Sequence, residues 1–143
     1  MLCWGNTRHG QLGLGGIDEE ILTLPRENKS FATKRVVQIA CGYNHTLYLL
    51  DDGTVFSSGN NDFEQLGHDG SHTRPEIVAS LETQFITRIA AGHSFSLALS
   101  KSGSLYCWGA VTGDTESKMF FHPKPFVIKI DSPIIQVFFL NFF

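Results

Sequence analysis

Hydrophobic residues along the chain come in short runs that end at Gly, Asn or Asp. Three runs follow one another at 35–40 (RVVQIA), 46–50 (TLYLL) and 54–58 (TVFSS), and they contain many β-branched and aromatic residues. Asp52-Gly53 separates the last two runs, which is a usual signal of a tight hairpin. No segment has the convincing period of an amphipathic helix. The pattern therefore predicts short strands and an all-β fold.

The same pattern returns at an offset of 50, which places residue 40 on residue 90. The segment ACGYNHTLYLLDDGTVFSSG (40–59) aligns without a gap on AAGHSFSLALSKSGSLYCWG (90–109). The glycines shared by the two copies are Gly42 and Gly92, Gly53 and Gly103, and Gly59 and Gly109. Pro25 matches Pro75, which opens a fourth run, PEIVAS (75–80). Four strands in each unit of about 50 residues predict radially repeated four-stranded sheets, that is, a β-propeller.

The first residues of the chain are repeated at an offset of 54, which places residue 3 on residue 57. CWGNTRHGQLGLG (3–15) aligns on SSGNNDFEQLGHD (57–69), and the matched residues are Gly5 with Gly59 and Gln11-Leu12-Gly13 with Gln65-Leu66-Gly67. The change of offset from 54 to 50 indicates a four-residue insertion around GGIDEE (15–20). Trp4 and Trp108 share one strand position, where we expect core residues between blades.

The composition narrows the class of protein. The 143 residues, 42% hydrophobic and 17% charged, are enough for one folded domain. A net charge of −3 argues against a nucleic-acid partner. The apolar tail PIIQVFFLNFF (133–143) has 11 residues, fewer than the ~20 that span a membrane as a helix. Cys3, Cys41 and Cys107 form no CxxC pair, so we expect free thiols in the cytoplasm.

The glycine-rich stretch GQLGLGG (10–16) is a candidate phosphate loop, since bare backbone can approach an anion closely. A P-loop requires Lys and then Ser or Thr after its last glycine, whereas Gly16-Ile17 follow Gly15. At the offset of 54, Glu64 and Asp69 replace Gly10 and Gly15, so Gln-Leu-Gly is the element that both copies share. We therefore expect a Gln-Leu-Gly turn whose glycines set backbone geometry, and no phosphate site.

Histidines and acidic residues give no stronger candidate. His68 and His72 are four residues apart, but they lie in a loop with Gly70 between them, where we expect solvated side chains. His45 enters a strand, where a packed histidine bonded to the backbone is the expectation. The acidic residues 18–20 and 51–52 lie in a variable connection and a hairpin turn. We expect no catalytic residue, no cofactor and no metal ligand in this chain.

With both units in view, CWGNTRHGQLGLG and VVQIACGYNHTLYLLDDGTVFSSGNNDFEQLG resemble tandem repeats of the regulator-of-chromosome-condensation (RCC) type. The resemblance covers residues 1–109 and implies a seven-bladed β-propeller. The opening MLCWGN…GQLGLGGIDEE is similar to the start of the HERC-type ubiquitin ligases, which combine an RCC-like domain with a HECT catalytic domain. The ubiquitin-accepting cysteine of those ligases belongs to the HECT domain, so none of the three cysteines here inherits that role.

The third unit departs from the pattern. No Gln-Leu-Gly follows Gly109, although Pro123 matches Pro75, and FFLNFF (138–143) stands where the next Gly-x-x-His strand is due. Smaller departures are Phe95 at the position of His45 and Glu64 at that of Gly10. We expect RCC-type repeats at 1–109 and a degenerate, incomplete third unit with an aberrant apolar tail at 110–143. The fold would be a partial propeller, truncated to about two and a half four-stranded blades of a seven-bladed architecture.

The resemblance implies a non-catalytic protein-interaction module whose partner is a substrate, an adaptor or a small GTPase. From the acidic balance and the short apolar tail we expect no nucleic acid and no membrane as partners. We expect specificity in the loops 14–24 and 68–74, because loops on a rigid scaffold tolerate change. Guanine-nucleotide exchange on a small GTPase, as the founding member of the family performs, is the alternative, and a cytoskeletal or trafficking scaffold stays open. The open edges of an incomplete propeller would also favour self-association.

Overall fold

The computed structural model describes residues 1–112, 119–130, 132 and 134. Its strands are β1 (Leu2–Asn6), β2 (Ile21–Glu27), β3 (Val36–Cys41), β4 (His45–Leu50), β5 (Val55–Gly59), β6 (Glu76–Ile77), β7 (Ile86–Ala91), β8 (Phe95–Ser100), β9 (Leu105–Thr112) and β10 (Met119–Ile128). A short 3-10 helix, η1 (Ala79–Leu81), follows β6. The described part is therefore nearly all β, as the short apolar runs predict.

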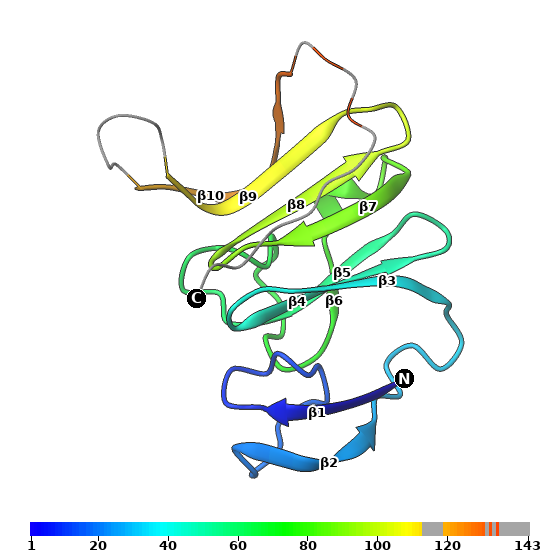
Figure 1. Ribbon diagram of the computed structural model, residues 1–143, viewed down its shortest axis with the longest axis vertical. Coiled ribbons are helices and arrows are strands. Elements are labelled where there is room, and N and C mark those ends of the chain that lie inside the picture. Colours follow the sequence, from blue (N-terminus) through cyan, green and yellow to red (C-terminus); the bar gives the residue numbers. More distant parts are fainter. Residues whose placement is uncertain (113–118, 131, 133, 135–143) are drawn as a thin grey trace.

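The strands form three antiparallel sheets that follow one another from the bottom to the top of Figure 1. β1 and β2 form a two-stranded sheet, which we call the half-blade. The first blade has the strand order β3-β4-β5-β6, and the second blade has the order β7-β8-β9-β10. This arrangement is the partial propeller of about two and a half blades that the repeats predict.

The half-blade is the first sheet along the chain. The segment around Pro123, which its sequence places in an incomplete third unit, lies in β10 and pairs with β9, where Phe126 is opposite Cys107. This segment therefore supplies the fourth strand of the second blade. The expected boundary at residue 109 falls inside β9. The apolar tail at 133–143, apart from residue 134, lies outside the described residues.

The register repeats from blade to blade. Gly59 is opposite His45 in the first blade, and Gly109 is opposite Phe95 in the second. Gly59 has φ +121° and Gly109 has φ +92°. A Cβ at Gly59 would lie 2.4 Å from the Asn44 carbonyl oxygen, and a Cβ at Gly109 would lie 2.6 Å from the Ser94 carbonyl oxygen. The neighbouring backbone thus excludes any side chain, which is why both copies have glycine here.

The main core lies between the first and second blades. It includes Leu47, Leu49 and Val55 from the first blade, Ile89, Ala98 and Trp108 from the second, and Leu81 from η1. Trp108 is 0% exposed. Removal of apolar surface from water is the main driving force for such packing, so this interface holds the two blades together.

Trp4 does not share the environment of Trp108, because 60% of it is exposed. The expectation that both tryptophans are core residues is therefore wrong for Trp4. Trp108 packs against the preceding blade near Gly67, where a Cβ would lie 2.9 Å from the indole Nε1. Trp4 lies in the half-blade, which has two strands and no described sheet before it. Burial at this repeat position depends on the neighbouring blade.

Candidate functional site

The Gln-Leu-Gly loops are closed by the same side-chain clamp in both units. The Gln11 amide donates to Asn6 Oδ1 at 3.2 Å, and the Gln65 amide donates to Asn60 Oδ1 at 2.8 Å. Each glutamine Oε1 also accepts a backbone N–H from two residues earlier, at 3.0 Å in the first loop and 2.9 Å in the second. Sequence reasoning overlooked the two asparagines, although they align at the offset of 54.

Each loop is also fixed to the following blade. Thr46 Oγ1 donates to the Gln11 carbonyl at 2.8 Å, and Ser96 Oγ donates to the Gln65 carbonyl at 2.8 Å. Thr46 and Ser96 are matched at the offset of 50, but the identity differs, so the pair drew no attention in the sequence. The repeated glutamine therefore closes its loop with its side chain and docks it with its backbone.

The leucine of the motif has a different environment in each copy. Leu66 is 0% exposed, and its carbonyl accepts a 2.7 Å bond from Ser57 Oγ. Leu12 is only half-buried.

The other repeat glycines with positive φ are Gly5, Gly13, Gly53, Gly67 and Gly103.

His45 connects the first blade to the second. It is 1% exposed, and its Nε2 lies 3.0 Å from Ser96 Oγ. Because the Ser96 hydroxyl donates its proton to Gln65, we assign the donated proton of the other bond to His45 Nε2. Burial lowers the pKa of His45 to about 4, so the ring is neutral near pH 7. The histidine is packed, as expected: its ring bonds the Ser96 hydroxyl, and a backbone hydrogen bond at Phe95 partly opposes the lowering of its pKa.

Gly42 and Gly92 leave room for the residue three positions later. A Cβ at Gly42 would lie 2.2 Å from the His45 ring, and a Cβ at Gly92 would lie 2.2 Å from the Phe95 ring. The two rings thus occupy equivalent places, which explains how Phe95 replaces the histidine.

Of the two loop histidines, His72 is exposed and His68 is not. His68 is half-buried, and its Nε2 lies 3.3 Å from the Ser57 carbonyl oxygen. Burial lowers its pKa. The expectation of a solvated side chain is therefore wrong for His68, because the loop folds back against β5.

Gln38 forms a second connection between the blades. Its side-chain amide donates to the Ile89 carbonyl at 2.8 Å, and its Oε1 accepts the Ile89 N–H at 3.0 Å. The side chain therefore pairs with β7 as a strand backbone would. Sequence reasoning gave no sign of this bridge, because the matched residue in the second unit is Arg88.

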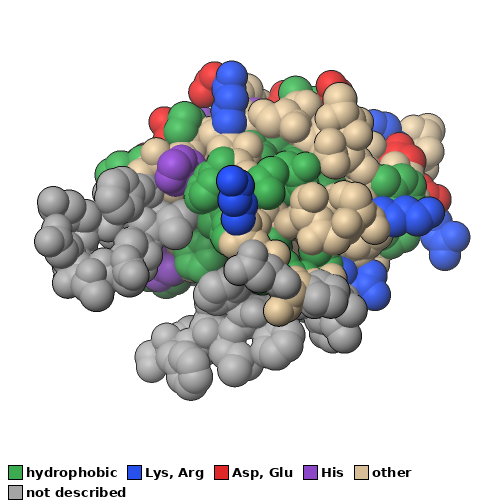
Figure 2. Space-filling model, turned by 90° about the horizontal axis from the view of Figure 1, so that it is seen from above, with side chains coloured by type: hydrophobic (Ala, Val, Ile, Leu, Met, Phe, Trp, Pro, Cys, Tyr) green, Lys and Arg blue, Asp and Glu red, His purple; other side chains and the backbone are tan. Residues whose placement is uncertain are grey.

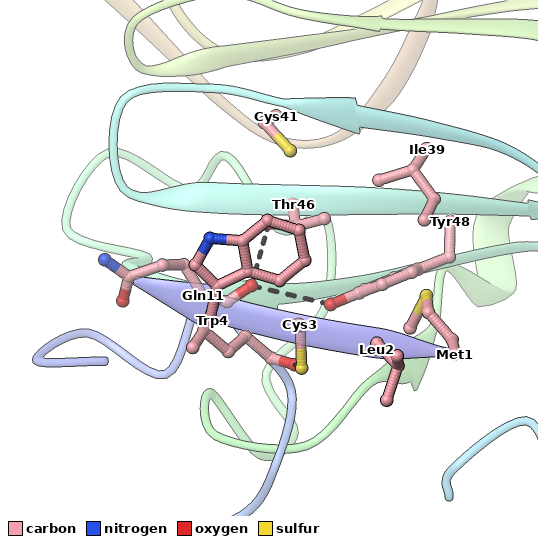
Figure 3. Close-up of a pocket in the computed structure, with 10 residues that line it drawn as sticks. Met1, Leu2, Cys3, Trp4, Gln11, Ile39, Cys41, Thr46 and Tyr48 are labelled. Atoms are coloured by element: carbon pink, nitrogen blue, oxygen red, sulfur yellow. Dashed lines mark hydrogen bonds between the residues drawn. The ribbon is translucent and has the colours of Figure 1, made fainter. Parts of the chain in front are cut away.

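An apolar groove of about 230 Å³ lies between the half-blade and the first blade (Figure 3). Trp4 lines it from β1, and Ile39, Cys41 and Tyr48 line it from the first blade. Figure 3 shows the Thr46 and Tyr48 hydroxyls directed at the Gln11 carbonyl. Burial raises the pKa of Tyr48 to about 12, so its hydroxyl stays protonated near pH 7. The groove can therefore accept apolar side chains, and among the described residues no Lys, Arg, His, Asp or Glu side chain lines it.

The three cysteines are free thiols. Burial raises the pKa of Cys3, and it raises that of Cys107 to about 11. A raised pKa disfavours the nucleophilic thiolate, so neither cysteine has the environment of a reactive one. Within residues 1–112, 119–130, 132 and 134, no group of three His, Cys, Asp or Glu side chains could hold a metal ion. The same residues contain no helix long and apolar enough to cross a membrane.

The two loops expected to carry specificity meet at one place. The Gly15 N–H of the first loop donates to the Thr73 carbonyl of the second at 2.8 Å. Ion pairs join Glu20 to Arg8 in the segment after β1 (2.9 Å) and Glu19 to Arg26 of β2 (3.0 Å). The hydrogen bond from Arg26 also lowers the pKa of Glu19. Loops 14–24 and 68–74 therefore lie in contact with each other beside the seam between the half-blade and the first blade, which we call the first seam.

Comparison with protein families identifies this architecture. The model of the regulator of chromosome condensation (RCC1) repeat matches residues 1–49 and 52–99, and a second model of this repeat matches residues 36–65. The chain belongs to the RCC1 repeat family. The first RCC1 repeat begins at β1 and runs into β4, and the second begins just before β5 and runs into β8. Each RCC1 repeat thus gives its first two strands to one blade and its last two to the next.

Curated relatives include HERC-type ligases. The chain is 50% identical over 162 aligned positions to the probable E3 ubiquitin-protein ligase HERC4 of Rattus norvegicus and 51% identical to that of Homo sapiens. In both cases the alignment covers 76% of this chain and 15% of the relative. Protein RCC2 of Mus musculus is 37% identical over 74% of this chain and 20% of its own length. The chain thus spans only a small part of these relatives.

Solved structures show the same fold. Prp20p from Saccharomyces cerevisiae, whose binding to Gsp1p and histones was studied with its structure, has a TM-score of 0.76 and 26% identity. The match covers 92% of this chain and 34% of Prp20p. Human WBSCR16 also has a TM-score of 0.76, at 24% identity over 93% of this chain and 36% of its own.

Proposed function

We propose that this chain is a protein-binding repeat segment of a HERC-type E3 ubiquitin-protein ligase, in which it holds substrates or adaptors. The observation that carries the proposal is the 50% identity to HERC4 across 76% of the chain. The family models that match are repeat models, so we place ubiquitin transfer outside this chain. The free thiols with raised pKa values agree with a role in binding and not in catalysis.

The geometry supports binding of a protein partner because it joins rigid blades to exposed, variable loops. The blades are tied to each other through Gln38 and His45, while residues 18–20 are exposed. A rigid framework limits the conformational entropy that a binding surface loses when a partner docks. The insertion in loop 14–24 makes this seam differ from the next one, so we assign partner specificity to it.

Capture of partners by the purified chain tests this proposal. We expect Glu19→Ser/Glu20→Ser to reduce the amount of captured partner several-fold. The matched control is Asp51→Ser/Glu82→Ser, which removes the same charge. Asp51 is exposed in the turn between β4 and β5, and Glu82 is exposed just after η1. Captured proteins should lose ubiquitin in cells depleted of the parent ligase. Capture that is equal in both double variants contradicts the role of the loop, and unchanged ubiquitin contradicts the ligase part.

The second candidate is nucleotide exchange on a small GTPase. It is supported by the likeness to Prp20p, whose binding to Gsp1p was studied. Release of a fluorescent guanine nucleotide from a panel of small GTPases tests it, with and without the chain. No acceleration across the panel contradicts this candidate.

Self-association is a further part of the proposal, because both outer sheets present apolar side chains. Trp4 is 60% exposed on the half-blade, and Phe121 and Val127 of β10 are 51% and 50% exposed. Figure 2 shows hydrophobic side chains reaching the surface on the side of the second blade. We expect a mass that rises with concentration in light scattering. A constant monomer mass contradicts this part.

We also propose a cytoplasmic location, which the three free thiols support. Fractionation of cells that express the tagged chain tests the location, and recovery in the secretory or nuclear fraction contradicts it.

A further inference from the structure

A polar cleft of about 330 Å³ opens where loops 14–24 and 68–74 meet, at the seam between the half-blade and the first blade. Its walls are Gly13 and Leu14, residues 27–30 at the end of β2, and Arg74 from the loop before β6. None of these residues lines the apolar groove of Figure 3. The volume of the cleft lies at the lower end of the range of ligand pockets.

Arg74 is positioned by packing. A Cβ at Gly15 would lie 3.2 Å from Nη2, 3.3 Å from Nε and 3.4 Å from Cζ of Arg74. These similar distances place the guanidinium flat against the bare backbone of Gly15. The bond from the Gly15 N–H to Thr73 fixes the backbone next to Arg74. The planar group therefore keeps its donor edges for a ligand.

The charges of the cleft are not neutralised by ion pairs. Among the described residues, the ion pairs of this region use Arg8, Arg26, Glu19 and Glu20, and none involves Arg74, Lys29 or Glu27. The cleft thus contains two cations and one carboxylate. Asn28 donates to the Leu12 and Gly13 carbonyls, so it shapes the wall. An incoming anion would meet a net positive site.

The next unit shows that the fold does not require these charges. At the offset of 50, Ala79 stands at the position of Lys29, and His122 precedes Pro123 where Arg74 precedes Pro75. The buried apolar residue of the segment is kept, as Phe31 in one copy and Leu81 in the other. The repeat therefore maintains the packing of the seam, while the cations are particular to the first seam.

We propose that this cleft binds an anionic side chain of a partner polypeptide, either a phosphorylated serine or threonine or a carboxylate. Arg74 would form paired hydrogen bonds to two oxygens, and Lys29 would add a point charge. Glu27 would oppose the same anion. The inference rests on the proposed protein-binding function and names the chemical group that this surface recognises.

NMR titration of the full chain tests the cleft, with N-acetyl-phosphoserine amide, N-acetyl-aspartate amide and inorganic phosphate as separate probes. We expect shifts at the amides of Gly15 and Ser30. Arg74→Gln and Lys29→Gln should each weaken binding about tenfold, as expected for a lost hydrogen bond to a charged group. Glu27→Gln should strengthen binding several-fold. The control Lys101→Gln, on an exposed turn of the second blade, should leave the affinity unchanged.

The opposite signs make the test decisive. A purely structural role of these residues would not make the Glu27 variant bind more tightly, so weaker binding by that variant overturns the proposal. Binding of inorganic phosphate without binding of either amide overturns the claim of a peptide partner. The two amides distinguish phosphate from carboxylate recognition. If the chain captures partners in cells but binds none of the three probes, the anion-binding proposal is overturned and the proposed protein-binding function stands. If the chain binds a probe but captures no partner, the proposed function is overturned and anion binding by the cleft stands.

Discussion

At the residue scale, His45 joins two blades through a ring that stays neutral. Its pKa is about 4 in the folded chain and about 6.5 in the unfolded chain. The unfolded chain therefore binds more protons between these values, so stability is complete above pH 6.5 and falls as the pH falls toward 4. We expect this one group to remove about 3 kcal/mol over that window. Urea unfolding at a series of pH values measures the slope.

His45→Phe is the matched control for this pH dependence, because Phe95 fills the equivalent place over Gly92. The variant should lose the additional slope between pH 6.5 and 4 while it keeps its fold. Equal slopes in the two proteins would show that carboxylates alone cause the loss of stability in acid.

Gly59 tests the close approach of the backbone at the start of β4. Gly59→Ala places a methyl group 2.4 Å from the Asn44 carbonyl oxygen at a φ of +121°. We expect a loss of at least about 2 kcal/mol in the free energy of unfolding. Gly16→Ala is the control, since nothing lies within 4 Å of its Cβ position, and it should change stability by less than about 0.5 kcal/mol. A similar cost for both variants would contradict the steric argument.

At the element scale, the Gln38 side chain links β3 to β7, two strands that belong to different sheets. Gln38→Ala leaves the Ile89 N–H and carbonyl without this partner, so we expect a loss of about 1–3 kcal/mol. Hydrogen exchange of the Ile89 amide should accelerate with it. Gln84→Ala, which loses only an exposed bond to Thr83, should match the wild-type chain in both measurements. Unchanged exchange at Ile89 would show that the bridge does not hold the blades together.

The prediction of strands and hairpins from sequence succeeded where the evidence was local. Runs such as TLYLL and the turn at Asp52-Gly53 carry their own signals, and the spacing of glycines reports turns that any copy must make. The exposure of Trp4 could not be predicted, because burial at this repeat position depends on a neighbouring sheet. The bridges from Gln38, Thr46 and Ser96 were overlooked because they join residues far apart in sequence. The cations of the polar cleft come together only through folding of three segments.

At the scale of the whole molecule, the two tryptophans lie in different environments: Trp4 is exposed on the half-blade, and Trp108 is buried between the two blades. We expect iodide to quench the Trp108→Phe variant, which retains the exposed Trp4, much more strongly than the Trp4→Phe variant, which retains the buried Trp108. Urea should remove the difference as the blades separate. If self-association covers the half-blade, quenching of Trp4 should fall as protein concentration rises. Equal quenching of both variants at low concentration would contradict the arrangement of the blades.

The stagger between repeats and blades has a consequence for how such a chain changes length. A break between the two RCC1 repeats, at residues 50–51, divides the first blade into β3-β4 and β5-β6. Neighbouring repeats therefore share one blade. After a protease cut at the repeat boundary, the two fragments would still be joined by strand pairing within that blade. Loss or duplication of one whole repeat, by contrast, joins the first two strands of a blade to the last two strands of an equivalent blade. The number of blades can therefore change by whole repeats, whereas loss of part of a repeat leaves a sheet with fewer than four strands.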